Sequence, residues 1–306
     1  MKAIKRLGTD APVDAYRKTQ RGALRRVPLT EDEFRDLEHA RPKCIVVDDD
    51  AVLIAEPRPG RVDLHYAFPD QASFVLRFPP MLERIAALFT LDEAAFGMFF
   101  RLTDRALRGY VEPVLFENAF EVKREWLRME LSELPDDGSM DAAIAPGFRL
   151  RAARPDDAEA IVQLNIAAFP APSATAETAA SDIRSDPFWV LEDESTGRAI
   201  GFLHLHTRLA PTGYISDLAL HPGYQGRGLG EALMRWALVW FREQGLRRAA
   251  LTTNTDNARA ISLYRKLGFT IAEIGVDYRR PIDEDEVRQV LERQRAEHIT
   301  VRRAFS

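Results

Sequence analysis

A glycine-rich segment that follows an apolar run has the residue types of an anion-binding turn. The run 215–220 leads through His-Pro-Gly-Tyr into Gln225-Gly226-Arg227-Gly228-Leu229-Gly230, after which a helical pattern begins. Glycine adopts positive φ without strain and has no Cβ to keep a ligand away from the backbone. The first amides of a helix lack internal partners and lie at the positive end of its dipole. The segment therefore predicts a phosphate or pyrophosphate site on these amides, with a charge-assisted contact from Arg227.

The spacing of the glycines argues against a dinucleotide fold. A nicotinamide- or flavin-binding turn has the spacing G-x-G-x-x-G and an acidic residue about 20 residues further on. Here the spacing is G-x-G-x-G, and residues 247–253 contain neither Asp nor Glu. A tight turn that binds nothing is the other alternative.

A second segment lies 27 residues beyond Gly230 and reads N-A-R-A-I-S-L-Y-R-K-L-G-F from Asn257 to Phe269. Together, the two segments resemble the GNAT superfamily of N-acetyltransferases. The first fits the acyl-CoA signature Q/R-x-x-G-x-G/A, and the second fits N-x-x-A-x-x-L-Y-x-x-x-G-F. The resemblance covers about 148–280, whereas the first half of the chain shares only the order of its elements.

The resemblance implies acetyl-CoA as co-substrate and a role for each residue of the two segments. In this family the fourth strand splays from the fifth, and the pantetheine arm pairs with the exposed backbone of the fourth. Tyr264 would be the general acid that protonates the departing thiolate, which suits a phenol with an ordinary pKa of about 10. A core aromatic is the alternative for Tyr264. The residues expected to bind the coenzyme are Leu218, Ala219, Leu220, Gln225, Gly226, Arg227, Gly228, Leu229, Gly230 and Asn257.

The general base is less well defined by the sequence. Family members that act on peptide amino termini often carry Glu five residues before the Asn, and here that position is Thr252. Asp217, on the strand expected to bear the acyl group, is the first candidate for the base. His204, His206 and Glu192 are candidates for a base or for a substrate contact. The two histidines alternate with leucines and so share one face of a strand. A water chain would need none of these side chains.

The expected elements follow one order in both halves: helix, three strands, helix, strand, helix, strand. The predicted fold class is α/β (α+β), with two GNAT-like domains that each have a mixed, mostly antiparallel central sheet flanked by helices. The predicted domains are a basic arm at 1–28, a degenerate domain at 29–134, a linker at 135–147 and a catalytic domain at 148–306. Thr30 and Glu33 form an expected capping box. Further helices are expected over 81–89, 104–109, 229–244 and 257–267. A helix over 283–297 and a last strand over 299–305 are expected to extend the catalytic domain.

The amino-terminal half has no counterpart to the glycine turn. Residues 69–80 contain no glycine, so we expect no pyrophosphate site there and one coenzyme site per chain. The first half would then form a wall of the acceptor cleft, a dimer surface or a regulatory module, so a homodimer is one option for assembly.

The composition excludes several classes of protein. The chain has 306 residues, a formal charge of −5, and no apolar run long enough to span a membrane. The mildly acidic balance argues against nucleic-acid binding. Cys44, the one cysteine, cannot form an internal disulfide, which fits a reducing cytoplasm, and it begins an apolar run that predicts a buried thiol. The common metal-binding spacings are missing, so no metal is expected.

These observations together predict an acyltransferase that moves an acetyl group from acetyl-CoA to a primary amine of a small molecule or peptide. The amine would attack the thioester directly, because the segments offer an acid and a coenzyme cradle but no protein nucleophile. One alternative is a non-catalytic sensor or interaction module that binds acyl-CoA. Another is an acetyltransferase like mycothiol synthase, whose tandem halves and length this chain resembles.

Overall fold

The computed structural model describes residues 24–26, 31–58, 60–91, 93–135, 143–169 and 175–304. The chain divides into two compact units. The N-terminal unit comprises residues up to Trp126 together with 274–306, and the C-terminal unit comprises 127–273. Among the helices that the structure describes, none combines the length and apolar character needed to cross a bilayer.

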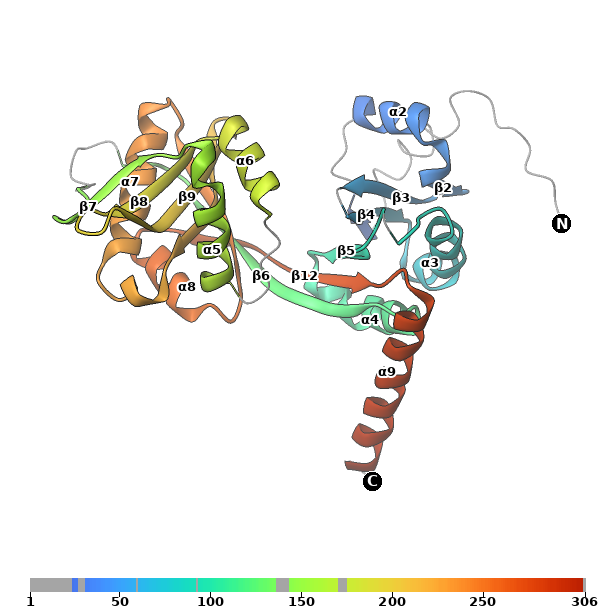
Figure 1. The fold of residues 1–306 in the computed structure, drawn as a ribbon. Helices are drawn as coiled ribbons and strands as arrows, with labels where there is room; N and C mark the ends of the chain where they lie inside the picture. Colours follow the sequence, from blue (N-terminus) through green and yellow to red (C-terminus); the bar gives the residue numbers. More distant parts are fainter. Residues whose placement is uncertain are drawn as a thin grey trace. The chain divides into compact units, whose positions relative to one another are not determined.

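The N-terminal unit alternates helices with strands (Figure 1). Its strand order is β2-β3-β4-β5-β12, and β1 pairs with β4. The elements in chain order are β1 (Leu24–Arg26), α2 (Glu31–Ala40), β2 (Ile45–Asp48), β3 (Ala51–Arg58), β4 (Arg61–Phe68), α3 (Gln71–Ala86), β5 (Met98–Leu102), α4 (Arg108–Glu117), part of β6 (Glu121–Leu131), part of β12 (Thr270–Arg280) and α9 (Glu284–Ala304).

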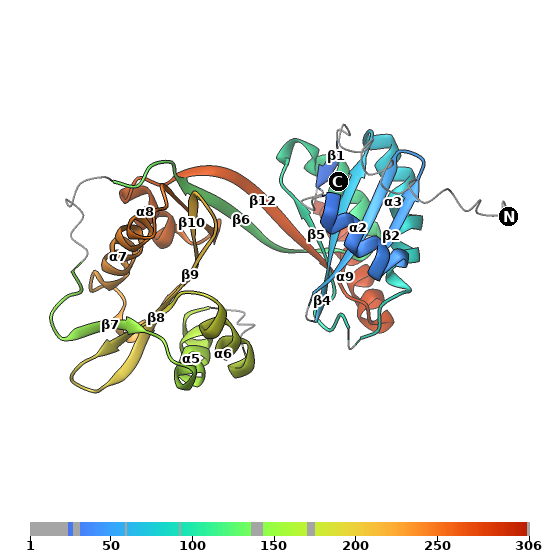
Figure 2. The ribbon, with the colours of Figure 1, turned by 90° about the horizontal axis from the view of Figure 1, so that it is seen from above.

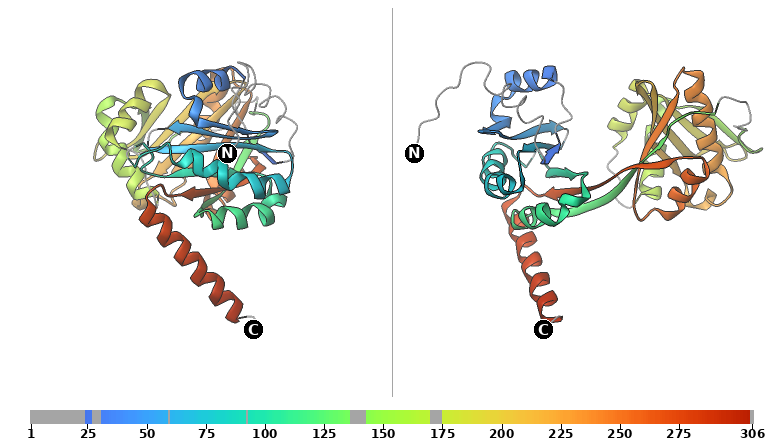
Figure 3. Two further views of the ribbon diagram at one scale, coloured as in Figure 1. Left: turned by 90° about the vertical axis from the view of Figure 1, so that its right-hand side faces the viewer. Right: turned by 180° about the vertical axis from the view of Figure 1, so that it is seen from behind.

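Strand β3 is buried on both faces, because helices cover the sheet on either side. Phe34 of α2 packs with Val52 and Ile54 on one face. On the other face, Leu53 joins the larger core to which α3 contributes Phe74. Figure 3 shows α2 in blue and α3 in teal on opposite sides of these strands.

In the C-terminal unit, helices cover both faces of the sheet, with α5 and α6 on one side and α7 and α8 on the other (Figure 2). Its strand order is β6-β11-β10-β9-β8-β7. Strand β10 pairs parallel with β11 and antiparallel with β9, and the pairs β9–β8 and β8–β7 are also antiparallel. The elements are β7 (Phe148–Ala152), α5 (Ala158–Ala168), α6 (Ala176–Ser185), β8 (Phe188–Asp193), β9 (Arg198–Leu209), β10 (Thr212–Leu220), α7 (Leu229–Glu243), β11 (Arg248–Asn254) and α8 (Ala258–Lys266).

The structure confirms the expected order of helices and strands in both halves and the burial of Cys44, which lies directly before β2. Three expected boundaries were wrong. Helix α3 begins at Gln71 rather than at 81, because the Asp70 carboxylate accepts a hydrogen bond from Ser73 N and caps it. The short helix expected at 104–109 continues through α4 to residue 117. Residues 299–304 extend α9 rather than forming a strand. The expected cap at Thr30 lies outside the described residues.

The division between the units also differs from the predicted boundary. Residues 274–306 belong to the N-terminal unit rather than to the unit that begins at 148. The cause is strand pairing: Val276–Arg280 of β12 pair antiparallel with β5. Helix α9 then returns to the same unit, where Gln294 Nε2 donates to Phe120 O at 2.7 Å.

Candidate active site

The glycine turn after β10 has the backbone that the sequence predicted. Gly226 and Gly228 have φ of +80° and +79°, in the region that favours glycine. A Cβ added at Gly228 would meet no atom within 4 Å, so space beside the backbone is open there. The phenol of Tyr224 fixes the start of the turn by donating to Asp193 Oδ2 at 2.8 Å.

Helix α7 begins without a capping side chain, since its N-cap residue is Gly228. The first amide of α7 with a helical partner is that of Ala232, which donates to Gly228 O. The amides of residues 229–231 have no hydrogen-bond acceptor among the described residues. Uncapped amides, positive φ and an open approach fit an anion such as a pyrophosphate.

Two arginines lie at this turn. Arg227 donates to Gly223 O at 3.0 Å and its guanidinium lies 4.9 Å from the Tyr224 ring centroid. Arg259, on the first turn of α8, donates to Gln225 Oε1 at 3.1 Å, and Gln225 Nε2 donates to Leu220 O. Sequence reasoning missed Arg259, although its place inside the N-x-x-A segment was a usable signal.

Strand β10 leaves the edge next to β11 unpaired over its second half. Thr212–Ile215 pair parallel with β11, and the pairing ends at Ile215. Residues 218–220 pair only with β9, on the opposite edge. The backbone of Leu218, Ala219 and Leu220 is therefore available toward β11, directly before the glycine turn. This is the splay that the resemblance implied.

Asn257 and Tyr264 lie on α8, which follows β11. Asn257 caps α8, because its Oδ1 accepts a hydrogen bond from Ala260 N at 3.2 Å. The ring of Tyr264 packs on Phe269, with 6.1 Å between centroids, and burial raises the pKa of its phenol to about 12. Tyr264 is therefore protonated at neutral pH, as a general acid must be.

A β-bulge brings the candidate base next to a histidine. The register between β10 and β9 shifts between Ile215 and Asp217, so that Asp217 lies opposite His204. Asp217 Oδ2 lies 3.3 Å from His204 Nδ1, and the Asp217 side chain is 39% exposed. Burial alone would lower the pKa of His204, but the hydrogen bond with Asp217 and the nearby aspartates outweigh burial and raise it.

His206 lies on the same face of β9 as His204, as expected, with 4.5 Å between the ring centroids. Both rings face Asp186, the residue after α6: His204 Nε2 is 3.6 Å and His206 Nδ1 is 3.2 Å from its carboxylate. Arg208 also pairs with Asp186, at 2.7 Å. No pattern in the sequence pointed to Asp186, because neither its position nor its neighbours form a recognisable motif.

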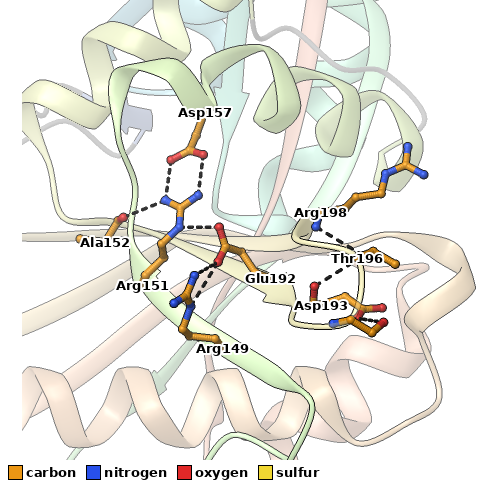
Figure 4. A network of polar contacts seen from close by, with 9 residues as sticks. Arg149, Arg151, Ala152, Asp157, Glu192, Asp193, Thr196 and Arg198 are labelled. Atoms are coloured by element: carbon orange, nitrogen blue, oxygen red, sulfur yellow. Dashed lines mark hydrogen bonds and ion pairs between the residues drawn. The ribbon is translucent and has the colours of Figure 1, made fainter.

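Glu192 does not belong to this group of candidates. Its carboxylate is held by Arg149 at 2.7 Å and by Arg151 at 2.6 Å, and Arg151 also binds both oxygens of Asp157 (Figure 4). Hydrogen bonds from Arg149 and Arg151 overcome burial and lower the pKa of Glu192, which makes it a poor base. Glu192 therefore stabilises the β7–β8 edge. Thr252, where a base occurs in some family members, instead bonds Tyr214 at 2.9 Å.

The N-terminal unit fills the same positions with its own chain. Strand β4 pairs with β5 only over Val62–Leu64, much as β10 pairs with β11. Beyond that point, residues 66–68 pair with β1, and because β3 occupies the opposite edge, β1 lies on the edge that faces β5. The Asp70 carboxylate caps the following helix, where it would repel an anion. Both features argue against a second coenzyme site.

The chain matches the family model of the acetyltransferase (GNAT) family over residues 158–269. A mycothiol acetyltransferase from Amycolatopsis mediterranei is 31% identical over 210 residues, which cover 63% of this chain and 69% of that protein. The chain belongs to the GNAT family of acetyltransferases. A mycothiol acetyltransferase from Saccharomonospora viridis is 30% identical over 196 residues. This alignment covers 58% of the chain and 60% of the relative. The alignment with a mycothiol acetyltransferase from Propionibacterium freudenreichii covers 53% of that relative's length.

Solved structures confirm the fold and the tandem arrangement. A GCN5-related N-acetyltransferase from Sphaerobacter thermophilus superposes with a TM-score of 0.62 at 20% identity, over 83% of this chain and 86% of that one. A tandem GNAT protein from the clavulanic acid biosynthesis pathway gives a TM-score of 0.59 at 13% identity, over 90% and 96% of the two chains. At these identities the likeness concerns the fold alone.

Proposed function

We propose that this protein transfers an acetyl group from acetyl-CoA to a primary amine by direct attack of the amine on the thioester. The observation that carries the proposal is the unpaired edge of β10, which leads into uncapped amides at the start of α7. A pantetheine arm needs such a backbone edge, and a pyrophosphate needs such amides.

The residues expected to hold the coenzyme are those of the turn and of the two elements beside it. The amides from Gly226 to Gly230 would bind the pyrophosphate, and Leu218–Leu220 would pair with the arm. Arg259 extends this set, because its guanidinium lies at the turn. Acetyl-CoA bound there would supply an activated acyl group and a thiolate leaving group.

Two side chains carry out the two proton transfers, one as general base and one as general acid. Asp217 accepts a proton from the attacking nitrogen, and its hydrogen bond to His204 holds the carboxylate in place. As the C–N bond forms and the C–S bond breaks, Tyr264 donates its phenolic proton to the departing sulfur. The raised pKa of Tyr264 keeps that proton available at neutral pH.

The acceptor that we propose is a small primary amine. The relatives named mycothiol acetyltransferase favour a small amine acceptor such as the cysteinyl sugar conjugate that mycothiol synthase acetylates. Peptide amino termini fit less well, because Thr252 replaces the carboxylate often found in enzymes that use them.

The test is calorimetry followed by a thiol-release assay. Purified protein should bind one acetyl-CoA per chain and release free thiol with at least one member of a panel of amines that includes the cysteinyl sugar conjugate, amino acids, polyamines and peptides. Binding without thiol release across the panel would favour the non-catalytic sensor. Failure to bind acetyl-CoA would refute the site itself.

A further inference from the structure

Asp186, His204 and His206 form a compact group of metal-ligand side chains in the C-terminal unit. Each offers one donor atom, and the three atoms lie within 4.8 Å of one another. Asp186 connects the group, since its Oδ2 lies 3.6 Å from His204 Nε2 and its Oδ1 lies 3.2 Å from His206 Nδ1.

His204 has a buried nitrogen that the protein leaves without a partner. The residue is only 7% exposed, and its Nε2 makes no hydrogen bond within the described part of the chain. Asp186 Oδ2, at 3.6 Å, is beyond hydrogen-bond distance. A buried polar nitrogen of this kind costs free energy unless a ligand satisfies it.

The other nitrogen of His204 makes the contact that metal-bound histidines usually make. Nδ1 lies 3.3 Å from the carboxylate of Asp217. A histidine that binds a metal typically donates its second N–H to a carboxylate, which fixes the ring and the tautomer. With the proton on Nδ1, the lone pair of Nε2 is directed toward Asp186 and His206.

We propose that Asp186, His204 and His206 bind a divalent transition-metal ion, with Zn²⁺ as the best match to two imidazoles and one carboxylate. Bond lengths of about 2.0–2.2 Å place tetrahedral ligands about 3.4 Å apart. The carboxylate of Asp186 lies close to that distance from both imidazoles, through Oδ2 to His204 Nε2 at 3.6 Å and through Oδ1 to His206 Nδ1 at 3.2 Å. Small rotations of the carboxylate and of the partly exposed His206 ring would bring one oxygen and both ring nitrogens around a single ion. With three protein ligands, a fourth position stays open for water or a substrate atom.

The charges around the group favour a cation, with one exception. Asp182 and Asp217 add negative charge near His204. Arg208 opposes the metal, because it pairs with Asp186 Oδ1 at 2.7 Å. Its side chain is 66% exposed, so it can leave Asp186 for solvent at little cost. Arg208 is thus a competitor for the carboxylate and a sensitive point for a test.

The experiment titrates Zn²⁺ into the full chain, without a histidine tag, by calorimetry, and records the visible absorption of the Co²⁺-loaded protein. We expect one ion per chain at this group and intense tetrahedral Co²⁺ bands. His206→Gln should abolish both signals in the same concentration range, whereas His39→Gln, at an exposed position of α2, should change neither. Arg208→Gln should tighten binding, and Asp217→Asn should weaken it by about 10- to 100-fold.

Thermal denaturation and acetyl-CoA binding of each variant show whether it is folded, so that loss of metal is not confused with loss of structure. Equal Zn²⁺ affinity in the native chain and in folded His206→Gln would overturn the proposal, as would weaker binding in Arg208→Gln. These readouts need no acetyl transfer, so the metal site and the proposed function can fail separately. The sequence-based expectation of no metal would fall if the ion binds.

Discussion

A pair of glycine substitutions tests the coenzyme site in isolation from stability. Gly228 and Gly245 stand at opposite ends of α7 with nearly equal φ, +79° and +80°. A Cβ at either position would meet no atom within 4 Å. The two positions therefore differ in one respect that matters here: only Gly228 lies on the predicted path of the pyrophosphate.

The magnitudes follow from the backbone and the amides. Placing alanine in the left-handed region costs about 1–2 kcal/mol, so Gly228→Ala and Gly245→Ala should lose about the same stability. At Gly228 the new methyl group also occupies the open space beside the turn. Loss of one amide contact to a charged phosphate costs about 1.5–3 kcal/mol, which weakens acetyl-CoA binding roughly 10- to 150-fold.

The assay is thermal denaturation of both variants, followed by calorimetric titration with acetyl-CoA. Gly245→Ala should bind like the native chain, Gly228→Ala should bind more weakly, and Gly228→Trp should not bind. Equal affinity for Gly228→Ala and the native chain would refute the assignment of the turn. An equal loss of affinity in Gly245→Ala would show that the effect comes from stability rather than from the site.

Three other predictions concern catalysis, stability and stoichiometry. Tyr264→Phe should lower turnover by roughly 100-fold or more with little change in acetyl-CoA affinity, because only the donated proton is lost; steady-state kinetics with calorimetry will check it. Asp277→Asn should destabilise the N-terminal unit by about 2 kcal/mol, since the carboxylate accepts hydrogen bonds from Arg101, Arg124 and Trp126. Burial opposes its charge, but the arginines outweigh burial and lower the pKa of Asp277. The stability is thus present above the ordinary value of 3.8 and is lost as pH falls through the lowered pKa, so urea denaturation should show the gap between the proteins closing at acid pH. Removal of residues 1–28 deletes β1 and so exposes the edge of β4. The chain should still bind one acetyl-CoA, as measured by calorimetry, because Asp70 still caps α3. Binding of two acetyl-CoA molecules per chain would contradict this prediction.

The sequence predicted what is encoded locally. Helix α7 was expected over 229–244 and α8 over 257–267, and both lie within a residue or two of those bounds. The glycines at 226 and 228 predicted the positive φ that the structure has. The two histidines of β9 were placed on one face from their alternation alone.

The residue pattern could not predict contacts between segments that are distant in the sequence. Nothing in residues 274–280 indicates that they complete the N-terminal unit, because pairing with β5 depends on which edge is free in the fold. Asp186 meets the histidines only through the turn after α6. Glu192 had the right residue type for a base, but its two arginine partners on β7 turn it into a structural ion-pair centre.

The two units show that the fold by itself does not decide coenzyme binding. Both contain a strand that separates from its parallel neighbour, at Leu64 in β4 and at Ile215 in β10. In the N-terminal unit, β1 takes the freed edge and a carboxylate takes the helix amides. In the C-terminal unit both remain available. The three residues of β1 and the carboxylate of Asp70 therefore block, in the N-terminal unit, the positions that the C-terminal unit leaves free for a coenzyme. For this reason the shared order of elements does not predict a coenzyme site in the first half.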